Sequence, residues 1–187
     1  MDIEPRHSPA ENRGALFLDR DGTLIFDKHY LSDPAGVELI PGVIDALVRA
    51  RALGYKLFIL TNQSGIGRGM YTLDDVHRCN DRMDELLGLP RPIWDGICIA
   101  TEAPHEPSPY RKPSPAYILE TIAQHGLDPA RCWMIGDRQS DIDAGRNAHI
   151  HAIAVCTGKH DAAGWAQLAL PGLPVYADLA EFVATLR

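Results

Sequence analysis

Residues 15–23 read ALFLDRDGT, and this stretch decides the fold. Its first four residues are apolar, and the five that follow are charged, polar or glycine. A short apolar run of this kind is typical of a strand that is buried on both faces of a parallel sheet. The polar residues therefore follow the carboxyl end of a strand, which is where open α/β sheets bind their ligands.

The same pattern recurs along the chain. Further short apolar runs predict strands at residues 56–60, 96–100, 132–135, 151–155 and 175–176. Segments of helical length lie between them, at about 42–54, 72–87, 116–124, 139–147, 162–168 and 179–186. This alternation predicts an α/β fold with a doubly wound, Rossmann-like, mostly parallel sheet and helices on both faces.

Two stretches lack regular periodicity. Residues 24–41 follow the first strand and are expected to form a flap or hairpin beside its end. Residues 101–115 contain five prolines and are expected to form an irregular loop. Neither stretch is long enough for a separate cap domain. We therefore expect a loose lead-in at residues 1–13 and one domain at residues 14–187.

The composition limits the classes of partner. The 187 residues carry a formal net charge of −7 and no dense run of lysine and arginine, so nucleic-acid binding is not expected. The four cysteines form no closely spaced pair, which is typical of thiols in a reducing compartment. No apolar run approaches the ~20 residues of a membrane span, and residues 1–13 lack the apolar core of a signal peptide. We expect a cytoplasmic monomer that binds neither membranes nor nucleic acid.

The first polar group contains Asp19 and Asp21. Side chains two residues apart in an extended segment point to the same side, so both carboxyl groups can face one reacting centre. One carboxylate can attack phosphorus and form an aspartyl phosphate, while the other acts as acid and base toward the leaving group and water. A calcium loop or an acidic turn would use the same residue types, so this pair alone leaves these interpretations open.

The second polar group is Thr61, Asn62, Gln63 and Ser64, which follows the predicted strand at 56–60. A hydroxyl and neighbouring backbone N–H groups can hold phosphoryl oxygens. The same residue types also serve as ordinary helix caps and turns. Residues 65–69, GIGRG, are too rich in glycine for an ordinary helix and match no complete nucleotide-binding motif.

The third polar group, Arg111 and Lys112, ends the proline-rich loop. Lys112 could neutralise both Asp19 and a transferring phosphoryl group, and Arg111 could bind a phosphate through two N–H groups. Exposed cations are usually only solvated, so a functional role for this group is inferred only together with the other three groups.

The fourth polar group follows the predicted strand at 132–135. Asp137 is the expected Mg²⁺ ligand, because Mg²⁺ prefers carboxylate and carbonyl oxygens together with water. Asp141, one helical turn further on, could orient Asp137 or a metal-bound water. An acidic helix start would look similar. Because all four groups follow predicted strands or the loops between them, a Mg²⁺-dependent phosphatase explains them better than four coincidences.

Residues 14–157 resemble the haloacid dehalogenase (HAD) superfamily in all four groups. The resemblance implies a Rossmann-like core, Mg²⁺ and an aspartyl-phosphate intermediate. It implies that Asp19 is the nucleophile and a metal ligand. Asp21 would be the general acid and base and would give its backbone carbonyl to the metal. Thr61 and Lys112 would steady the phosphoryl group, and Asp137 would complete the metal ligands.

A branch of this superfamily is especially similar, namely the one with D-glycero-D-manno-heptose 1,7-bisphosphate and histidinol-phosphate phosphatases. The similar stretches are LDRDGT at 18–23, TNQSGI at 61–66 and RKP at 111–113. The branch implies removal of the 7-phosphate of a heptose bisphosphate in carbohydrate metabolism, with histidinol-phosphate hydrolysis as the alternative. Substrate contacts are then expected from Asp27, Lys28, His29, Tyr30, Asn62, Gln63, Ser64, Arg111 and Arg138.

One departure from this branch concerns zinc. Many members carry a C-x-H and C-x-C zinc site in the loop before the Arg-Lys-Pro motif. Here residues 100–110 read ATEAPHEPSPY, with one histidine and no cysteine, so we predict no zinc.

Two further functions use similar sequence features. Polynucleotide 3'-phosphatases share the first two motifs, but the net charge of −7 argues against a surface that follows DNA. A phospho-accepting signalling domain also has an aspartate at a strand end, but it needs no leaving-group acid such as Asp21. A small phosphorylated sugar or metabolite is therefore the expected partner.

Overall fold

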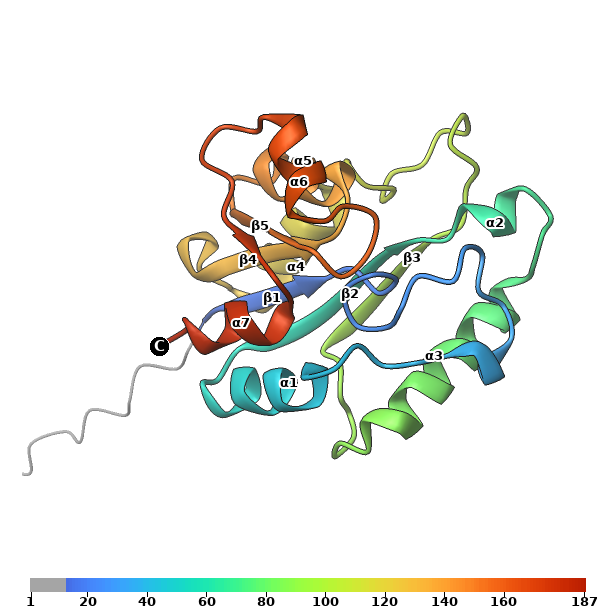
Figure 1. Cartoon of the computed structure of the whole chain (residues 1–187), viewed down its shortest axis with the longest axis horizontal. Coiled ribbons are helices and arrows are strands. Elements are labelled where there is room, and N and C mark those ends of the chain that lie inside the picture. The colour runs from blue at the N-terminus through green and yellow to red at the C-terminus, as the bar shows by residue number, and fades with distance from the viewer. Residues whose placement is uncertain (1–12) are drawn as a thin grey trace, which may run out of the picture.

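The computed structural model describes residues 13–187, and its centre is one six-stranded sheet (Figure 1). The strands are β1 (Ala15–Leu18), β2 (Lys56–Asn62), β3 (Gly96–Ala100), β4 (Cys132–Gly136), β5 (His151–Val155) and β6 (Val175–Tyr176). Their order is β3-β2-β1-β4-β5-β6, and every neighbouring pair is parallel. The chain winds outward from β1 in both directions, which confirms the predicted doubly wound α/β fold. Apart from Arg13, the expected lead-in lies outside the described residues.

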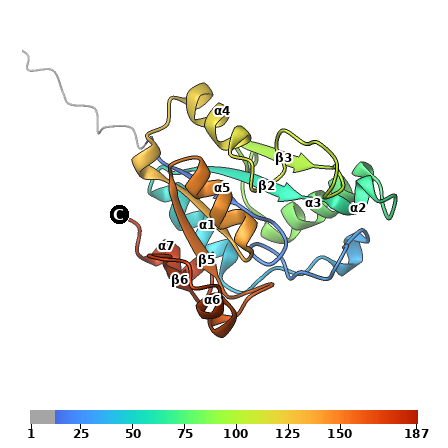
Figure 2. The same ribbon diagram turned by 90° about the horizontal axis from the view of Figure 1, so that it is seen from above.

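Helices cover both faces of the sheet (Figure 1, Figure 2). Within residues 13–187 they are α1 (Val43–Ala52), α2 (Ser64–Gly67), α3 (Leu73–Leu87), α4 (Ala116–His125), α5 (Gln139–Asn147), α6 (Ala162–Leu168) and α7 (Leu179–Ala184). Two short 3₁₀ turns, Pro34–Gly36 and Pro129–Arg131, complete the description. None of these helices combines the length and the apolar character that crossing a membrane requires.

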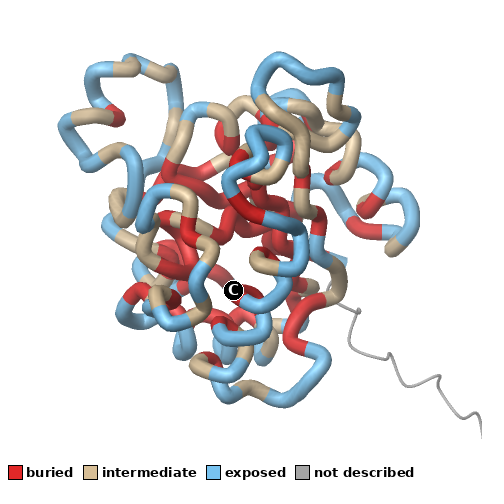
Figure 3. Tube along the Cα trace, turned by 90° about the vertical axis from the view of Figure 1, so that its right-hand side faces the viewer, coloured by how far each residue is buried: buried red, intermediate tan, exposed pale blue. Residues whose placement is uncertain are grey.

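Strand β1 shows why both faces must be covered. Its four residues are fully buried, and successive side chains enter different cores. Leu16 and Leu18 pack in the core that includes α1, α3 and α7, whereas Phe17 packs in the core that includes α4 and α5. Figure 3 shows the buried residues concentrated in the interior of the molecule. The sheet therefore holds the carboxyl end of β1 between two apolar layers.

The segment after β2 differs from the expectation. Residues 64–67 form a single helical turn, although the glycine content of residues 65–69 argued against a helix. The turn is short enough to need little intrinsic helix propensity. Gly65 is required by packing, because a Cβ atom there would lie 2.2 Å from the ring of Tyr71. The helix stops before Gly69, which has a positive φ of 69°.

The two irregular stretches lie beside the same end of the sheet. Ile25 forms isolated bridges with Asp21 and with Leu39, so the segment 24–41 folds back as the expected flap. The loop at 101–115 packs against α2, where the Gly67 N–H donates to the carbonyl of Thr101 at 2.8 Å. Ser108 donates to the Glu102 carboxylate at 2.7 Å, so side-chain hydrogen bonds as well as prolines shape this loop.

Candidate active site

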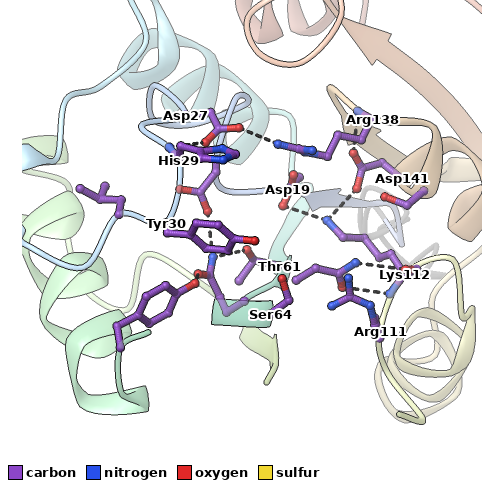
Figure 4. A pocket seen from close by; sticks show the side chains of 16 residues that line it. Asp19, Asp27, His29, Tyr30, Thr61, Ser64, Arg111, Lys112, Arg138 and Asp141 are labelled. Carbon is purple, nitrogen blue, oxygen red and sulfur yellow. Dashed lines mark hydrogen bonds and ion pairs between the residues drawn. The ribbon is translucent and has the colours of Figure 1, made fainter. Parts of the chain in front are cut away.

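The polar groups come together in one cavity of about 280 Å³ beside the carboxyl ends of β1, β2 and β4 (Figure 4). Parallel strands bring these ends to one edge, and the loop after β3 adds two cations from a distant part of the chain. The predicted site residues that line the cavity are Asp19, Asp21, Asp27, His29, Tyr30, Thr61, Asn62, Gln63, Ser64, Arg111, Lys112 and Arg138. Two others do not line it. Asp137 is fully buried, and Lys28 pairs with Glu38 on the outside at 3.0 Å.

Lys112 lies at the centre of the site (Figure 4). Its buried ammonium group is 2.8 Å from Asp19 Oδ1 and 2.7 Å from Asp141 Oδ1. Burial acts to lower the pKa of Lys112, but the charges of Asp141 and Asp19 outweigh it and raise the pKa above its ordinary value. The Asn62 side chain exchanges two hydrogen bonds of 3.0 Å with the Lys112 backbone. Strand β2 thereby fixes a charged group that belongs to the loop after β3.

Three buried carboxylates form a cluster at this site. Asp19, Asp137 and Asp141 each offer an oxygen within 4.8 Å of the others. Burial first, and then the charges of Asp19 and Asp141, raise the pKa of Asp137 to about 7. Burial is also the main cause of the raised pKa of Asp19. Lys112 pairs with two of these carboxylates, and Arg138, which also pairs with Asp27, lies 3.9 Å from the third. The carboxylates therefore outnumber the cations, and unbalanced buried charge is costly.

The residues present fit a divalent cation. Asp137 Oδ1 is buried without a hydrogen-bond partner, while Oδ2 accepts the Lys159 N–H at 2.5 Å. Gly22, with a φ of 84°, lies so close to Asp137 that a Cβ atom would be 2.5 Å from Oδ2. Carboxylate oxygens with excess negative charge are what Mg²⁺ prefers. Among the described residues, Asp19 and Asp137 each keep one oxygen without a protein partner and could hold the ion. Both oxygens of Asp141 are engaged, Oδ1 by Lys112 and Oδ2 by the Arg138 N–H at 2.9 Å.

Asp21 lines the same cavity as Asp19. Its carboxylate accepts hydrogen bonds from the Arg20 guanidinium and from Gln63 Nε2. Gln63 in turn accepts from the Tyr71 hydroxyl and donates to Thr61 Oγ1. The amides of Gln63 and Asn62 are therefore both bound to the protein itself, although substrate contacts were expected from them.

The rim of the cavity carries two more cations. Arg138 forms an ion pair of 2.6 Å with Asp27 (Figure 4). Arg111 donates to the backbone carbonyl of Glu102 at 3.2 Å, and burial together with the nearby Arg68 lowers its pKa. The flap also brings strained backbone to this rim, because His29 has a φ of 53° and the residue after it one of 61°.

Sequence reasoning did not assign a role to Arg20, Tyr71 or Asn80. Arg20 stands inside the first motif, yet neither periodicity nor spacing distinguishes it from an exposed arginine. Asn80 carries a better signal, because it is a polar residue on the buried face of a helix. A buried polar side chain needs a partner, and here that partner is Arg20 Nη1 at 3.0 Å.

Known proteins resemble this chain over most of its length. A family described as HAD-hydrolase-like matches residues 109–182. The D-glycero-beta-D-manno-heptose-1,7-bisphosphate 7-phosphatase of Helicobacter pylori is 42% identical over 137 residues, 73% of this chain and 79% of that protein. The protein of the same name from Pasteurella multocida is 37% identical over 152 residues, which cover 78% of this chain and 83% of that protein.

Solved structures agree in fold. The D,D-heptose 1,7-bisphosphate phosphatase from B. bronchiseptica, in complex with magnesium and phosphate, has a TM-score of 0.84 to this structure. Its sequence is 27% identical, and the match covers 92% of this chain and 97% of that chain.

Proposed function

Because this chain belongs to the heptose-1,7-bisphosphate 7-phosphatase family of HAD-like phosphatases, we propose that it removes the 7-phosphate of D-glycero-D-manno-heptose 1,7-bisphosphate in a Mg²⁺-dependent reaction. The observation that carries this proposal is the position of Lys112. It lies 2.8 Å from Asp19 and 2.7 Å from Asp141, beside the third carboxyl group of the cluster, Asp137.

Asp19 is the proposed nucleophile. Its Oδ1 accepts a hydrogen bond from the Arg20 N–H and forms an ion pair with Lys112, both at 2.8 Å, which leaves Oδ2 to attack. The bond from Asp19 to phosphorus forms as the bond from phosphorus to the sugar oxygen breaks. Asp21 gives its proton to that oxygen and then removes a proton from the water that attacks the aspartyl phosphate. Phosphate leaves and Asp19 is restored.

The remaining residues of the site stabilise charge. Thr61 and Lys112 would hold the phosphoryl oxygens as negative charge develops on them. Asp19, Asp137 and the Asp21 carbonyl would hold Mg²⁺, which when bound neutralises phosphoryl charge as a Lewis acid. This role explains why three acidic groups are buried around so few cations.

The rim supports a bisphosphate substrate. The Arg111 guanidinium contacts a backbone carbonyl, so its positive charge is available to a second phosphate. Arg138 and the flap residues His29 and Tyr30 line the same cavity. We include in the proposal a cytoplasmic monomer without zinc, supported by residues 100–110, which contain no cysteine.

A panel of phosphate esters tests this function. Phosphate release is measured with both anomers of the heptose bisphosphate, histidinol phosphate and a 3'-phosphorylated oligonucleotide, with Mg²⁺ and with a chelator. The heptose bisphosphate is expected to have the highest kcat/KM, since discrimination resides in that ratio. A higher kcat/KM for another ester, or full activity with the chelator, would contradict the proposal.

A further inference from the structure

Arg20 is a buried arginine behind the proposed general acid. Its side chain is 1% exposed, and it contacts both oxygens of Asp21, with Nη2 also 2.9 Å from Oδ2. Nε donates to Asp21 Oδ2 and Nη2 donates to Oδ1, each at 3.0 Å. The third nitrogen, Nη1, donates to Asn80 Oδ1 on helix α3, also at 3.0 Å. Helix α3 and the catalytic strand are thus joined through one guanidinium group.

Stability alone is a poor reason for this arrangement. Burying an arginine beside a largely buried carboxylate is costly, and an apolar pair of similar volume often gives equal or greater stability. A planar guanidinium that binds a carboxylate with two hydrogen bonds does, however, fix the plane of the carboxylate. The contact therefore restricts Asp21 in a way that a single ion pair would not.

The hydrogen bonds also distinguish the two oxygens of Asp21. A carboxylate has about four lone-pair sites, two on each oxygen. Oδ2 uses both of its sites, because it accepts from Arg20 Nε at 3.0 Å and from Gln63 Nε2 at 2.8 Å. Oδ1 accepts one hydrogen bond, from Arg20 Nη2, and keeps one site open. Asp21 lines the cavity, so a ligand in the cavity can reach this open site.

We propose that Arg20 is a positioning residue for the general acid, and that the proton is carried by Asp21 Oδ1. This inference rests on the proposed function. As the bond from phosphorus to the leaving oxygen breaks, the proton on Oδ1 moves to that oxygen, and Asp21 becomes a carboxylate whose plane Arg20 still holds. Gln63 completes the arrangement, since the Tyr71 hydroxyl donates to its Oε1 at 2.7 Å and so orients its amide.

Leaving-group dependence tests the inference. An alkoxide needs a proton as it leaves, whereas nitrophenolate is a stable anion and does not. We measure kcat/KM, which includes leaving-group departure and excludes hydrolysis of the aspartyl phosphate, for the heptose bisphosphate and for p-nitrophenyl phosphate. Arg20→Lys keeps the charge but cannot form two parallel hydrogen bonds. It is expected to lose about 10²-fold on the heptose ester and less than about threefold on the nitrophenyl ester.

Further variants keep the test decisive. Tyr71→Phe removes only a hydroxyl and is expected to show the same selective loss at about three- to tenfold, so it carries the test if Arg20→Lys does not fold. Arg51→Lys is the matched control, because Arg51 forms an ion pair with Asp95 at 2.6 Å outside the site. Its rates on both esters are expected to equal those of the wild type.

The outcomes separate this inference from the proposed function. Equal losses on both esters in a folded Arg20→Lys protein, or in Tyr71→Phe, would overturn the positioning role. If the wild type did not hydrolyse the heptose ester, the proposed function would fail instead. The heptose ester would then be replaced by an alkyl phosphate that the wild type hydrolyses. The loss of kcat/KM on that ester, divided by the loss on p-nitrophenyl phosphate, would decide.

Discussion

Two clusters of charged residues lie at opposite ends of the sheet. Cations outnumber carboxylates in the first cluster, and carboxylates outnumber cations in the second. At the amino end, Asp95 directly precedes β3 and contacts Arg51 at 2.6 Å and Lys56 at 3.2 Å. It also accepts the Leu57 N–H at 2.9 Å. At the carboxyl end, Asp19 and Asp141 share Lys112, and the third carboxylate, Asp137, has Arg138 Nε at 3.9 Å.

The pKa values of Asp95 and Asp137 reflect how far neighbouring positive charge balances each carboxylate. Partial burial acts to raise the pKa of Asp95, but the Leu57 N–H and Arg51 outweigh it and lower the pKa. Burial and two neighbouring carboxylates raise the pKa of Asp137 to about 7. The amino-end cluster is satisfied within the chain, as expected of a structural contact. The carboxyl-end cluster retains negative charge, which is expected where a cation has to bind.

Removal of the nucleophile gives the largest expected effect. Asp19→Asn should lower kcat by at least about 10⁴-fold, since a nucleophile has no substitute in this mechanism. The Tm of this variant should equal or exceed that of the wild type, because the substitution removes one of three neighbouring carboxylates. Asp95→Asn is the control at the other end of the sheet, with kcat within about twofold of the wild type. Substantial turnover by Asp19→Asn would refute the assignment.

Removal of the lysine comes next. Lys112→Met leaves the buried carboxylates without a cation, which should lower the free energy of unfolding of the metal-free protein by about 3–5 kcal/mol. Arg51→Met leaves Asp95 with Lys56 and should cost about 1 kcal/mol or less. Urea denaturation measures both. Similar losses in the two variants would show that the clusters do not differ as described.

Addition of the metal should distinguish the two clusters. Mg²⁺ at about 100 times its Kd should stabilise the wild type by about 2.7 kcal/mol, seen as a rise in Tm. Asp95→Asn should respond equally, and Asp137→Asn should respond little or not at all. An unchanged response of Asp137→Asn would remove Asp137 from the metal site.

The smallest expected effect concerns pH at the amino-end cluster. The pKa of Asp95 is lowered in the folded state, so its contribution is present above the unfolded pKa of about 4 and is lost as pH falls through the folded value. Asp95→Asn should thus be less stable than the wild type by about 1 kcal/mol at neutral pH. The two proteins should converge in more acidic solution. If the difference in free energy of unfolding between the two proteins stayed constant across this pH range, the assigned role of the Asp95 carboxylate would be contradicted.

The strands and the location of the site could be predicted because they depend on local features. The apolar run at 15–18 matches β1, and parallel packing then brings the ends of β1, β2 and β4 together. Strands β2 and β4 extend further than expected, to Asn62 and Gly136, because the ladder continues into polar residues. Local pattern predicted where regular structure lies better than where it ends.

The contacts inside the site could not be predicted in the same way. Arg20 and Asn80 are 60 residues apart, and only the packing of α3 against the sheet brings them together. Asp141, for which a role in orienting Asp137 or a metal-bound water was predicted, forms an ion pair with Lys112 from a separate loop. Residue type and spacing identified the charged groups, whereas the choice of partner depends on long-range packing.

The central claim is that Asp19 forms an aspartyl phosphate, and chemical trapping tests it most directly. Protein quenched during turnover of the heptose bisphosphate is treated with borohydride, which reduces an aspartyl phosphate to homoserine, and the modified residue is located by mass spectrometry. We expect homoserine at position 19 when substrate and Mg²⁺ are both present, and none in Asp19→Asn. An unmodified Asp19, or reduction at another carboxyl group, would contradict the account.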